Sequence, residues 1–550
     1  ANLIGSGLLI VIVLAGNFIP SIPRSIFILD FGLSMVLLPG IRIGIRLFYS
    51  HIKSGKLRTG KPRGRKNLLI IGAGSAGDQL LREIHYNPLV NYNVVGFLDD
   101  DPQKQKARIR GIPVLSTIDG LPGLKVLFDE ILIAIPTADS SRMRRIVNLC
   151  KETGKPYKTV PGISEIINGK VNFSSVRDVS ITDIIGREEV NLDAGSIERF
   201  LDGKRVLITG AGGSIGSELV RQCLNFTPEK IYLLDNSEFN LFTVEKETRG
   251  YNNSIQISAL LADIRDREVL ERVFIHYQPD VVFHAAAYKH VPIQEEHPWQ
   301  AVNTNIKGTK NVGELSEQYG VEKFILVSTD KAVRPTSVMG ATKRIAELML
   351  QKNGKELKTQ FMAVRFGNVI GSSGSVIPTF REQIEKGGPV TVTHPDIERY
   401  FMSIPEAAQL ILQAGSLGNG GEVFVLKMGD PIKIDTVAKE LIRMSGHEPN
   451  VDIPIIYTGL RPGEKMYEEL ITEHENHIPT QHEKIMILQS KYNQISQKTL
   501  HARVDQLFYL CTLQDRHRIL KKLNDILPSY TPWNLNNEDD DGINLDIVNR

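Results

Sequence analysis

Cysteine is scarce in this chain of 550 residues, and its scarcity excludes two classes of protein. The three cysteines, Cys150, Cys223 and Cys511, are too few and too far apart for a disulfide framework or a zinc cluster. No set of His, Cys and Asp residues has the spacing of metal ligands either, so we predict no bound metal. This cysteine usage favours a reducing, cytoplasmic setting.

An excess of charge of one sign is also missing. Lys and Arg number 65 against 63 Asp and Glu, which gives a formal net charge of +2. Because proteins that bind nucleic acid usually present a strong positive field, nucleic acid is not an expected partner. Hydrophobic residues make up 41% of the chain, which excludes wholesale disorder. At about 150 residues per domain, the length indicates three to four modules.

Long apolar runs occur only near the N-terminus. Residues 3–19 carry no charge, and residues 26–48 are nearly as apolar. A helix needs about 20 apolar residues to cross a bilayer, so residues 1–50 are predicted to be a transmembrane or membrane-associated segment in contact with lipid. A cleaved signal peptide is an alternative for the first run. A re-entrant or interfacial segment is an alternative for the second, which contains Asp30 and Pro39.

A basic segment follows directly. Residues 51–66 include seven Lys or Arg residues and no acid. Positive flanks of this kind normally stay in the cytoplasm and contact anionic lipid headgroups. We therefore expect a juxtamembrane linker here, with the rest of the chain facing the cytoplasm.

Residues 66–77 combine an apolar strand, a Gly-x-Gly-x-x-Gly turn and the start of a helix. Glycines allow the tight turn, and the helix N-terminus offers free N–H groups to a pyrophosphate. Further strands are expected at residues 93–98 and 130–135. We predict a first Rossmann-like domain over residues 67–190. A bound nucleotide and a purely structural or regulatory role are both open for this domain.

The pattern returns in residues 204–216 as Gly-x-x-Gly-x-x-Gly. The next strand ends on Asp235, a carboxylate that accepts hydrogen bonds from ribose hydroxyls and repels a 2′-phosphate, which favours NAD over NADP. A third strand, at residues 260–264, places Asp263 near the adenine, and a fourth at 281–287 has small residues for close approach to a cofactor. The predicted cofactor-binding residues are Gly210, Gly213, Ser214, Ile215, Gly216, Asp235, Asp263, Ile264, Ala285 and Ala286.

A further apolar strand ends in a cluster of hydroxyl, carboxylate and amine groups, namely Thr329, Asp330 and Lys331. Polar groups at the carboxyl end of a strand, beside a cofactor crevice, are typical of active sites in open α/β sheets. Capping of the next helix is the alternative role for Asp330 and Lys331. That helix carries Met339 and Lys343.

These motifs resemble the extended short-chain dehydrogenase/reductase superfamily, whose catalytic unit is Ser/Thr with Tyr-x-x-x-Lys, and Met339 occupies the tyrosine position. The combination is similar to the large, membrane-anchored UDP-N-acetylglucosamine 4,6-dehydratases of bacterial surface-glycan pathways. The resemblance covers nearly the whole chain and is strongest over residues 204–470. That family usually has more transmembrane helices than residues 1–50 have room for, which a fragment beginning at Ala1 would explain.

The resemblance implies a lyase that passes hydride from C4 of the sugar to NAD, eliminates water across C5 and C6, and returns the hydride to C6. It implies that Asp330 is the general acid at the C6 oxygen, Lys331 the base at C5, and Lys343 a ligand of the nicotinamide ribose. Met339 cannot take a proton, so the C4 hydroxyl needs another group, such as Thr329 relaying to Asp330, or a water. Core packing is the alternative role for Met339.

Four residues are expected on the side of the UDP-N-acetylhexosamine substrate: His290, Asn368, Arg399 and Arg461. The resemblance implies that Asn368 contacts the nucleotide sugar. Arg461, in an Arg-Pro-Gly-Glu-Lys turn, suits a diphosphate because its guanidinium has forked donors. A packed loop histidine is the alternative for His290, and surface solvation is the alternative for Arg461.

The predicted fold class is α/β, with two Rossmann-like doubly wound parallel sheets after an N-terminal transmembrane segment. A catalytic domain with its substrate-binding part is expected over residues 191–485, and a helical extension with an acidic tail over 486–550. The predicted location is the bacterial inner membrane, as a multi-pass protein. Two alternative functions are a UDP-sugar 4-epimerase, against which Met339 argues, and a non-catalytic, membrane-tethered sensor of nucleotide sugar or NAD. Assembly into a homo-oligomer is left open.

Overall fold

The computed structural model describes residues 65–87, 90–138, 140–160, 176–179, 183, 192–249, 255–351, 358–472, 475–489 and 496–533. The expected membrane segment, most of the basic linker and the acidic tail lie outside these residues. Within the described ranges, no helix is both long enough and apolar enough to cross a membrane. The chain divides into two compact units.

The first unit contains a mainly parallel sheet in the order β3-β4-β2-β1-β5-β6. Its strands are β1 (Lys66–Ile71), β2 (Tyr92–Leu98), β3 (Arg108–Ile109), β4 (Ile112–Ser116), β5 (Glu130–Ile133) and β6 (Tyr157–Thr159). Helix α3 (Ser75–Tyr86) follows the glycine turn, and α4 (Ser140–Glu152) and β7 (Arg177–Asp178) come later in the chain. The parallel run β4-β2-β1-β5-β6 has the strand order of a Rossmann fold, as predicted.

The sequence of β1 shows why this sheet forms. Leu69, Ile70 and Ile71 are fully buried, because a central parallel strand is covered on both faces and therefore needs a continuous apolar run. The strands expected at residues 93–98 and 130–135 are confirmed, with ends that differ by one or two residues.

The second unit is built on a nine-stranded sheet in the order β10-β9-β8-β11-β12-β13-β18-β22-β21. Its strands are β8 (Arg205–Thr209), β9 (Lys230–Asp235), β10 (Gln256–Leu261), β11 (Val281–His284), β12 (Lys323–Val327), β13 (Gln360–Arg365), β18 (Val423–Leu426), β21 (Asn476–Pro479) and β22 (Ile485–Gln489). The strands from β10 to β18 are parallel, and β22 and β21 complete the edge in antiparallel register. All carboxyl ends of the parallel strands therefore meet at one edge.

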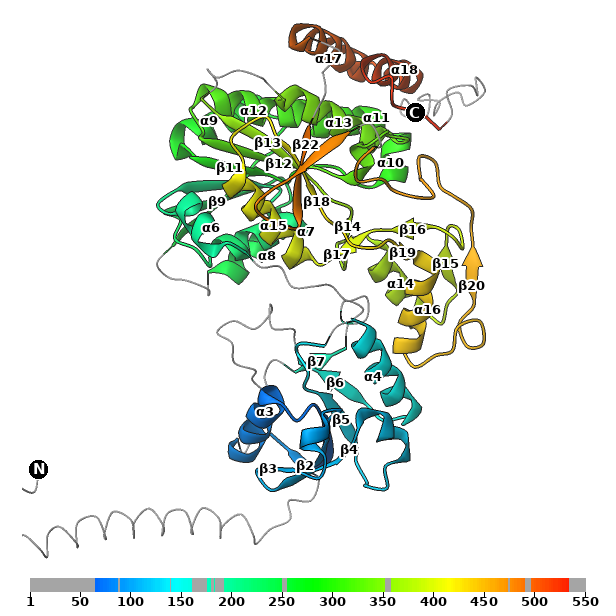
Figure 1. Cartoon of the computed structure of the whole chain (residues 1–550). Coiled ribbons are helices and arrows are strands. Elements are labelled where there is room, and N and C mark those ends of the chain that lie inside the picture. Colours follow the sequence, from blue (N-terminus) through cyan, green and yellow to red (C-terminus); the bar gives the residue numbers. More distant parts are fainter. Residues whose placement is uncertain are drawn as a thin grey trace, which may run out of the picture. The chain divides into compact units, whose positions relative to one another are not determined.

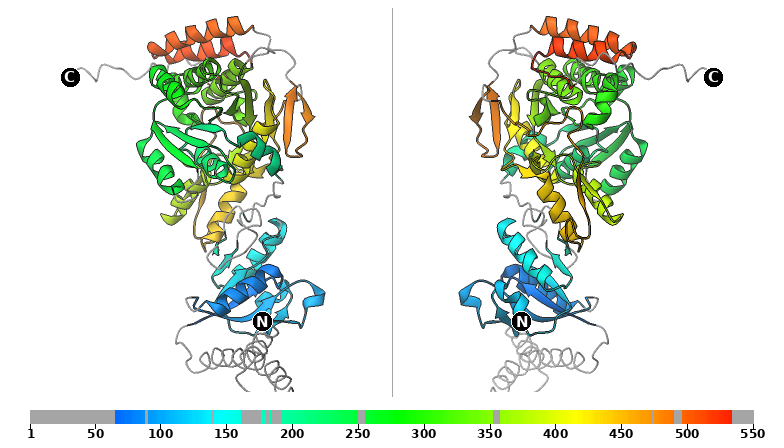
Figure 2. Two further views of the ribbon diagram at one scale, coloured as in Figure 1. Left: turned by 90° about the vertical axis from the view of Figure 1, so that its left-hand side faces the viewer. Right: turned by 90° about the vertical axis from the view of Figure 1, so that its right-hand side faces the viewer.

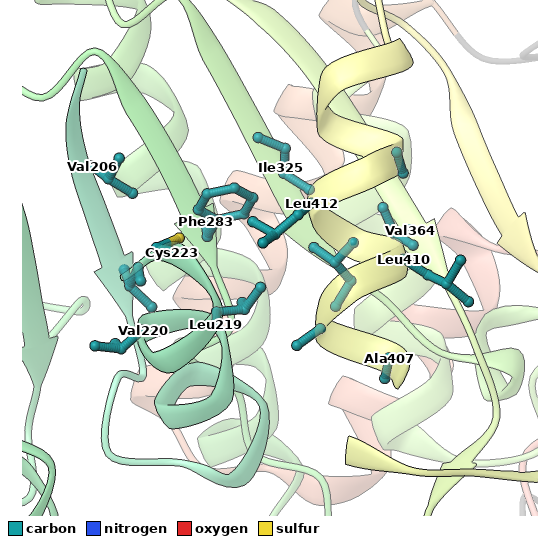
Figure 3. Packing of buried hydrophobic residues seen from close by; sticks show 14 of the residues in the cluster. Val206, Leu219, Val220, Cys223, Phe283, Ile325, Val364, Ala407, Leu410 and Leu412 are labelled. Carbon is teal, nitrogen blue, oxygen red and sulfur yellow. The ribbon is translucent and has the colours of Figure 1, made fainter. Parts of the chain in front are cut away.

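Helices cover both faces of this sheet (Figure 1). One face carries α6 (Ala194–Leu201), α7 (Ser214–Cys223), α8 (Glu238–Thr248) and α15 (Ile404–Leu417), and the other carries α9 (Arg267–Tyr277), α12 (Thr309–Gln318) and α13 (Val338–Leu350). Figure 3 shows the first of these cores, in which Leu219 of α7 and Leu412 of α15 pack near Phe283 of the sheet. Two separate apolar cores thus fix the sheet from both sides.

The third strand predicted in this unit, at residues 260–264, is wrong in its bounds. Strand β10 begins at Gln256 and ends at Leu261, so Asp263 and Ile264 lie in the following turn. The Asp263 carboxylate accepts a hydrogen bond from the backbone N–H of Arg265, 2.8 Å away, and such a side-chain turn competes with extended pairing. The boundary expected between residues 485 and 486 falls inside β22, which belongs to the sheet.

A smaller lobe is inserted after β13 and extends toward the same sheet edge. It contains α14 (Val376–Glu385), α16 (Ile434–Met444) and three short strand pairs: β14 (Asn368–Val369) with β17 (Phe401–Met402), β15 (Val390–Val392) with β20 (Ile455–Tyr457), and β16 (Glu398–Arg399) with β19 (Ile432–Lys433). The lobe has its own apolar core, in which Phe380 and Val437 are almost completely buried. Polar residues of its loops are thereby brought to the carboxyl ends of the main strands.

The C-terminal helices α17 (Gln497–Thr512) and α18 (Arg516–Ile526) pack against each other and against α13 (Figure 2). They also cover α11 (Pro298–Ala301) and the π-helical turn Val302–Gly308 that joins α11 to α12. Leu507 and Leu523 are fully buried in this third core, together with Ile345 of α13. The extension is therefore part of the folded unit and supports the helix that carries Met339 and Lys343.

Replacement of Leu523 by Ala tests this support. We expect the free energy of unfolding to fall by about 2–5 kcal/mol, because the change removes buried methyl groups and leaves a cavity. Urea unfolding followed by circular dichroism measures the loss. The control is Leu513→Ala at the end of α17, where the side chain is 49% exposed. Equal effects of the two changes would contradict the packing.

Candidate active site

The glycine turn between β8 and α7 is held in a shape that only glycine allows. Gly210 has a φ of +67°, and a Cβ there would lie 2.6 Å from the backbone nitrogen of Ala286. A Cβ on Gly216 would lie 2.0 Å from the carbonyl oxygen of Gly210. Helix α7 begins directly after Gly213, and no side chain caps its first N–H groups. Such a helix start binds phosphate in dinucleotide folds.

Asp235, at the end of β9, fixes this turn. Its Oδ2 accepts a hydrogen bond from the Gly212 N–H at 2.9 Å, and its Oδ1 accepts one from the Ser237 N–H at 2.9 Å. Each carboxylate oxygen keeps a further lone pair, so these contacts leave room for the predicted ribose hydroxyls.

Asp263 is committed to an ion pair. Its Oδ2 lies 2.6 Å from Nη2 of Arg265. Burial opposes ionisation of Asp263, but the hydrogen bonds and charge of Arg265 outweigh it and hold the pKa below its ordinary value. Ile264 packs so closely on Gly308 that a Cβ there would lie 2.5 Å from its Cδ1.

A cavity of about 1140 Å³ opens at the carboxyl ends of the parallel strands. It brings together these predicted residues: Gly210, Gly213, Ser214, Ile215, Gly216, Ala285, His290, Thr329, Lys331, Met339, Lys343, Asn368, Arg399 and Arg461. Five predicted residues do not line it: Asp235, Asp263, Ile264, Ala286 and Asp330. The glycine turn and the proposed chemical groups thus share one cavity.

Asp330 lies beneath the cavity wall and is fully buried. Its Oδ1 accepts hydrogen bonds from the Thr329 hydroxyl at 2.9 Å and from Nζ of Lys331 at 3.1 Å. Its Oδ2 has no hydrogen-bond partner among the described residues and lies against Gly367. Both hydrogen-bonding neighbours line the cavity, so Asp330 reaches it through them.

Lys331 is held by groups from three segments. Its Nζ donates to Oδ1 of Asp330 and to Oδ1 of Asn368, at 3.1 Å and 3.0 Å, and lies 3.5 Å from Oε1 of Glu468. Burial alone would lower the pKa of Lys331, but the charges of Asp330 and Glu468 outweigh it and raise the pKa above its ordinary value. Lys331 is consequently an ammonium at neutral pH and must lose a proton before it can act as a base.

Helix α13 presents Met339 and Lys343 to the cavity. Met339 is only 4% exposed. Nζ of Lys343 donates to the carbonyl oxygen of Val327 at 2.6 Å, and burial lowers the pKa of Lys343 to about 8. The helix start is fixed by Ser337, whose hydroxyl accepts from the Gly340 N–H, and by Glu295, whose carboxylate accepts from the Val338 N–H.

A buried ion pair joins the elements behind the cavity. Arg365 at the end of β13 donates from Nε and Nη2 to both carboxylate oxygens of Glu347 in α13, at 2.8 Å and 2.7 Å. The Ser328 hydroxyl, after β12, donates to the same carboxylate at 2.6 Å. Burial alone would raise the pKa of Glu347, but Arg365 and Arg344 outweigh it and hold the pKa at about 2.

The substrate-side residues differ in how free they are to bind. Arg399 already donates to the backbone carbonyls of Glu398, Lys465 and Met466, so it holds the loop after Gly463 in place. Arg461 is exposed, and no hydrogen bond or ion pair of its side chain is seen within the described residues, which suits a diphosphate ligand.

His290 and the loop opposite it meet closely. A Cβ on Gly374, which has a φ of +66°, would lie 2.6 Å from Cε1 of His290. Burial, with a smaller contribution from Lys289, lowers the pKa of His290 below its ordinary value, so the ring is neutral at pH 7. Nζ of Lys289 donates to the Ser372 hydroxyl of the same loop at 3.3 Å.

Comparison with known proteins identifies the family to which this chain belongs. A family model described as polysaccharide biosynthesis protein matches residues 206–490. The chain belongs to this polysaccharide biosynthesis family. A second model, described as a CoA-binding domain, matches residues 1–161.

Three relatives illustrate the range of the family. The capsular polysaccharide biosynthesis protein CapD of Staphylococcus aureus is 46% identical over 426 residues, 76% of this chain and 71% of that protein. An inverting UDP-N-acetylglucosamine 4,6-dehydratase of Campylobacter jejuni is 33% identical over 305 residues, 54% of this chain and 87% of that protein. A UDP-glucose 4-epimerase of Rickettsia bellii is 35% identical over 283 residues, 50% of this chain and 80% of that protein.

The predicted membership of the extended short-chain dehydrogenase/reductase superfamily is confirmed, and the chain is an enzyme of the sugar-nucleotide dehydratase and epimerase kind.

In the first unit, Asp99 repeats the arrangement of Asp235: its Oδ2 accepts a hydrogen bond from the Ala73 N–H of the glycine turn at 2.7 Å. Lys104 pairs with Asp99 at 3.3 Å. Within the described parts of the chain, no group of three or more His, Cys, Asp or Glu side chains is placed to hold a metal ion.

Sequence reasoning missed several residues that line the cavity. Glu468 follows the Arg-Pro-Gly-Glu-Lys turn and is next to a second glutamate, a pattern that is typical of an exposed loop. The loop from Ser372 to Ser375 is a small-residue stretch with no chemical signature. The strand-end position after β13 is the one signal that pointed toward this loop.

Replacement of Glu347 by Gln tests the ion pair behind the cavity. At pH 7 we expect the free energy of unfolding to fall by about 3–5 kcal/mol, because buried Arg365 loses its bidentate carboxylate partner and keeps only the longer contact of Nη1 with Glu475 at 3.6 Å. The folded-state pKa of Glu347 is about 2 against an ordinary 4.5. The difference from wild type should therefore be fully present above pH 4.5 and shrink as the pH falls toward 2.

Urea unfolding at a series of pH values measures this difference. The control is Glu382→Gln, which removes an exposed pair with Lys386 and should leave the unfolding midpoint unchanged. A loss that is the same at every pH would show that Glu347 contributes through packing rather than through its charge.

Proposed function

We propose that this enzyme carries out NAD-dependent 4,6-dehydration of UDP-N-acetylglucosamine, giving a UDP-4-keto-6-deoxy-N-acetylhexosamine for surface polysaccharide or glycoprotein glycans. One observation carries the proposal: the hydrogen-bonded group of Thr329, Asp330 and Lys331 reaches a cavity in which Met339 replaces a proton-carrying tyrosine. An ordinary dehydrogenase needs one proton acceptor, whereas dehydration needs an acid and a base in addition.

The residues of the glycine turn fit NAD. The close approach of Gly210 to Ala286 and the uncapped start of α7 leave N–H groups for the pyrophosphate. Asp235 keeps lone pairs for the ribose, and Lys343 holds positive charge beside it. The chemistry supplied by NAD in this site would be the reversible acceptance of a hydride, from C4 and then to C6. Asp263, bonded to Arg265, contributes to this site through that arginine, which lines the cavity.

The protons follow the hydrogen bonds of Asp330. The proton of the C4 hydroxyl passes through the Thr329 hydroxyl to Asp330, which supplies it to the departing C6 oxygen, so that hydroxide leaves as water. Neutral Lys331 takes the C5 proton, made acidic by the C4 ketone, exchanges it with solvent while it is an ammonium, and protonates C5 when the hydride reaches C6. Asn368 fixes Lys331 in place. The number of protons taken from the sugar thus equals the number returned to it and to the leaving water.

The diphosphate of the substrate is assigned to Arg461, whose guanidinium is exposed at the cavity. Arg399 holds the loop that carries it, and neutral His290 offers a hydrogen bond to sugar or phosphate. Residues 1–66 are assigned to attachment at the inner membrane with the catalytic unit in the cytoplasm, on the apolar and basic patterns of the sequence alone.

Incubation of the enzyme with UDP-N-acetylglucosamine in deuterated water tests the reaction. We expect a 4-keto-6-deoxy product with deuterium at C5 and no net accumulation of reduced cofactor, measured by mass spectrometry and NMR. UDP-N-acetylgalactosamine as sole product would instead establish the epimerase. Unchanged substrate beside intact bound cofactor would contradict both and favour the sensor.

Replacement of Asp330 by Asn tests whether this side chain transfers a proton without contributing to NAD binding. We expect kcat to fall by about 10²–10⁴-fold, because the amide can neither store nor supply the proton. The NAD content should not change, because Asp330 does not line the cavity. The control is Asp396→Asn, which breaks the exposed pair with Lys433 and should leave kcat unaltered. Loss of NAD from the Asp330 variant would show that the residue supports the fold instead.

A further inference from the structure

Glu468 is a buried carboxylate that forms a second ion pair with Lys331, in addition to that of Asp330. Its side chain is only 3% exposed, yet it lines the cavity. Its Oε1 lies 3.5 Å from Nζ of Lys331 and 3.9 Å from Nε of Arg399. Its Oε2 is buried and has no hydrogen-bond partner in the part of the chain that the structure describes. A carboxylate in this position is stable only if neighbouring cations offset its lost hydration.

The two cations are not equivalent. The guanidinium of Arg399 donates to the backbone carbonyls of Glu398, Lys465 and Met466 and to the carboxylate of Glu464. Lys331 has three N–H groups, and these face Asp330, Asn368 and Glu468. Asn368 is neutral, so the charge of Lys331 is balanced between two carboxylates that come from different segments.

We propose that Glu468 is a positioning residue that holds Lys331 between itself and Asp330 and sets how tightly Lys331 keeps its proton. The assignment of Lys331 as a base rests on the proposed function, but the charge arrangement does not. Each carboxylate directs one oxygen toward Lys331, and the other oxygen has no hydrogen-bond partner among the described residues. The segment that carries Glu468 also carries Arg461, which links the substrate-side loop to the proton balance of the site.

The charged groups around Lys331 define the expected pH effect. Asp330 and Glu468 favour its ammonium form, whereas Arg399 and burial oppose it. Lys465 is a further cation near both Glu468 and Asp330, and its Nζ donates to the carbonyl oxygen of Val333. Removing the charge of Glu468 therefore leaves Asp330 as the one carboxylate facing Lys331 among the described residues, and makes the ammonium easier to deprotonate.

The first measurement needs no substrate. In the full-length protein, the rate at which Lys331 is acetylated by acetic anhydride is followed against pH, with mass spectrometry of the peptide that contains it. Because the neutral amine reacts, the midpoint reports the pKa of Lys331. We expect Glu468→Gln to lower this midpoint by about one unit, and Glu468→Asp to restore most of it.

The matched control is Glu469→Gln, the same chemical change one residue along. Glu469 pairs with Arg334 at the surface and does not line the cavity, so the midpoint should equal that of wild type. Equal midpoints for Glu468→Gln and Glu469→Gln would overturn the proposal. If Glu468→Gln does not fold, Glu468→Asp carries the test, because its shorter carboxylate should lower the midpoint by a smaller amount.

The second measurement is the pH profile of kcat with UDP-N-acetylglucosamine. For Glu468→Gln the rising limb should move to lower pH by about one unit, while KM changes little. A purely structural role would lower kcat at all pH values without moving the limb, and would overturn the proposal. A shifted acetylation midpoint in a protein that does not convert this substrate would refute the proposed function and leave the role of Glu468 intact.

Discussion

The buried pair of Glu347 and Arg365 is the interaction on which the site depends. It ties α13 to the end of β13, and through Ser328 it also ties both to the end of β12. Those three elements carry every group to which we assign proton transfer. A bidentate guanidinium–carboxylate contact fixes direction as well as distance, and burial of both side chains strengthens it. The contact thus fixes α13 and the ends of β12 and β13 relative to one another, at the edge of the sheet where we propose that the reaction occurs.

Charge is distributed unevenly in front of that pair. Lys331 is held as an ammonium by carboxylates, whereas Lys343, deprived of a close carboxylate contact and buried, has its pKa lowered to about 8. The pKa values of two lysines in one cavity are thus shifted in opposite directions, and the difference comes from their surroundings, because the side chains are chemically the same. Under the proposed function, Lys331 acts on the C5 proton and Lys343 faces the cofactor.

The substrate side depends on parts of the chain that are distant in sequence. Arg399 donates to the backbone carbonyls of Lys465 and Met466, and Nζ of Lys465 donates to the carbonyl oxygen of Val333, two residues after Lys331. The C-terminal helices then cover the opposite side of α13, so this helix is packed between the sheet core and a third apolar core. Cofactor turn, proton-transfer cluster and substrate loop are consequently parts of one cooperative unit.

The sequence by itself determined the two Rossmann sheets, the glycine turns and the strand-end cluster at residues 329–331. It did so because buried parallel strands need continuous apolar runs, and tight turns need glycine, and both are local properties. It also indicated the family, through motifs that are contiguous. The end of β10 was predicted wrongly because the turn made by Asp263 is a side-chain effect that hydropathy does not register.

Only the tertiary structure decided which carboxylates act on Lys331. Asp330 is adjacent in sequence and was predicted, but Glu468 is brought there by the inserted lobe and its loop. The same applies to Arg365, whose partner lies in a different element, and to Arg399, whose guanidinium binds backbone rather than solvent. The physical reason is that burial and charge pairing are set by which segments meet, and a one-dimensional pattern does not contain those distances.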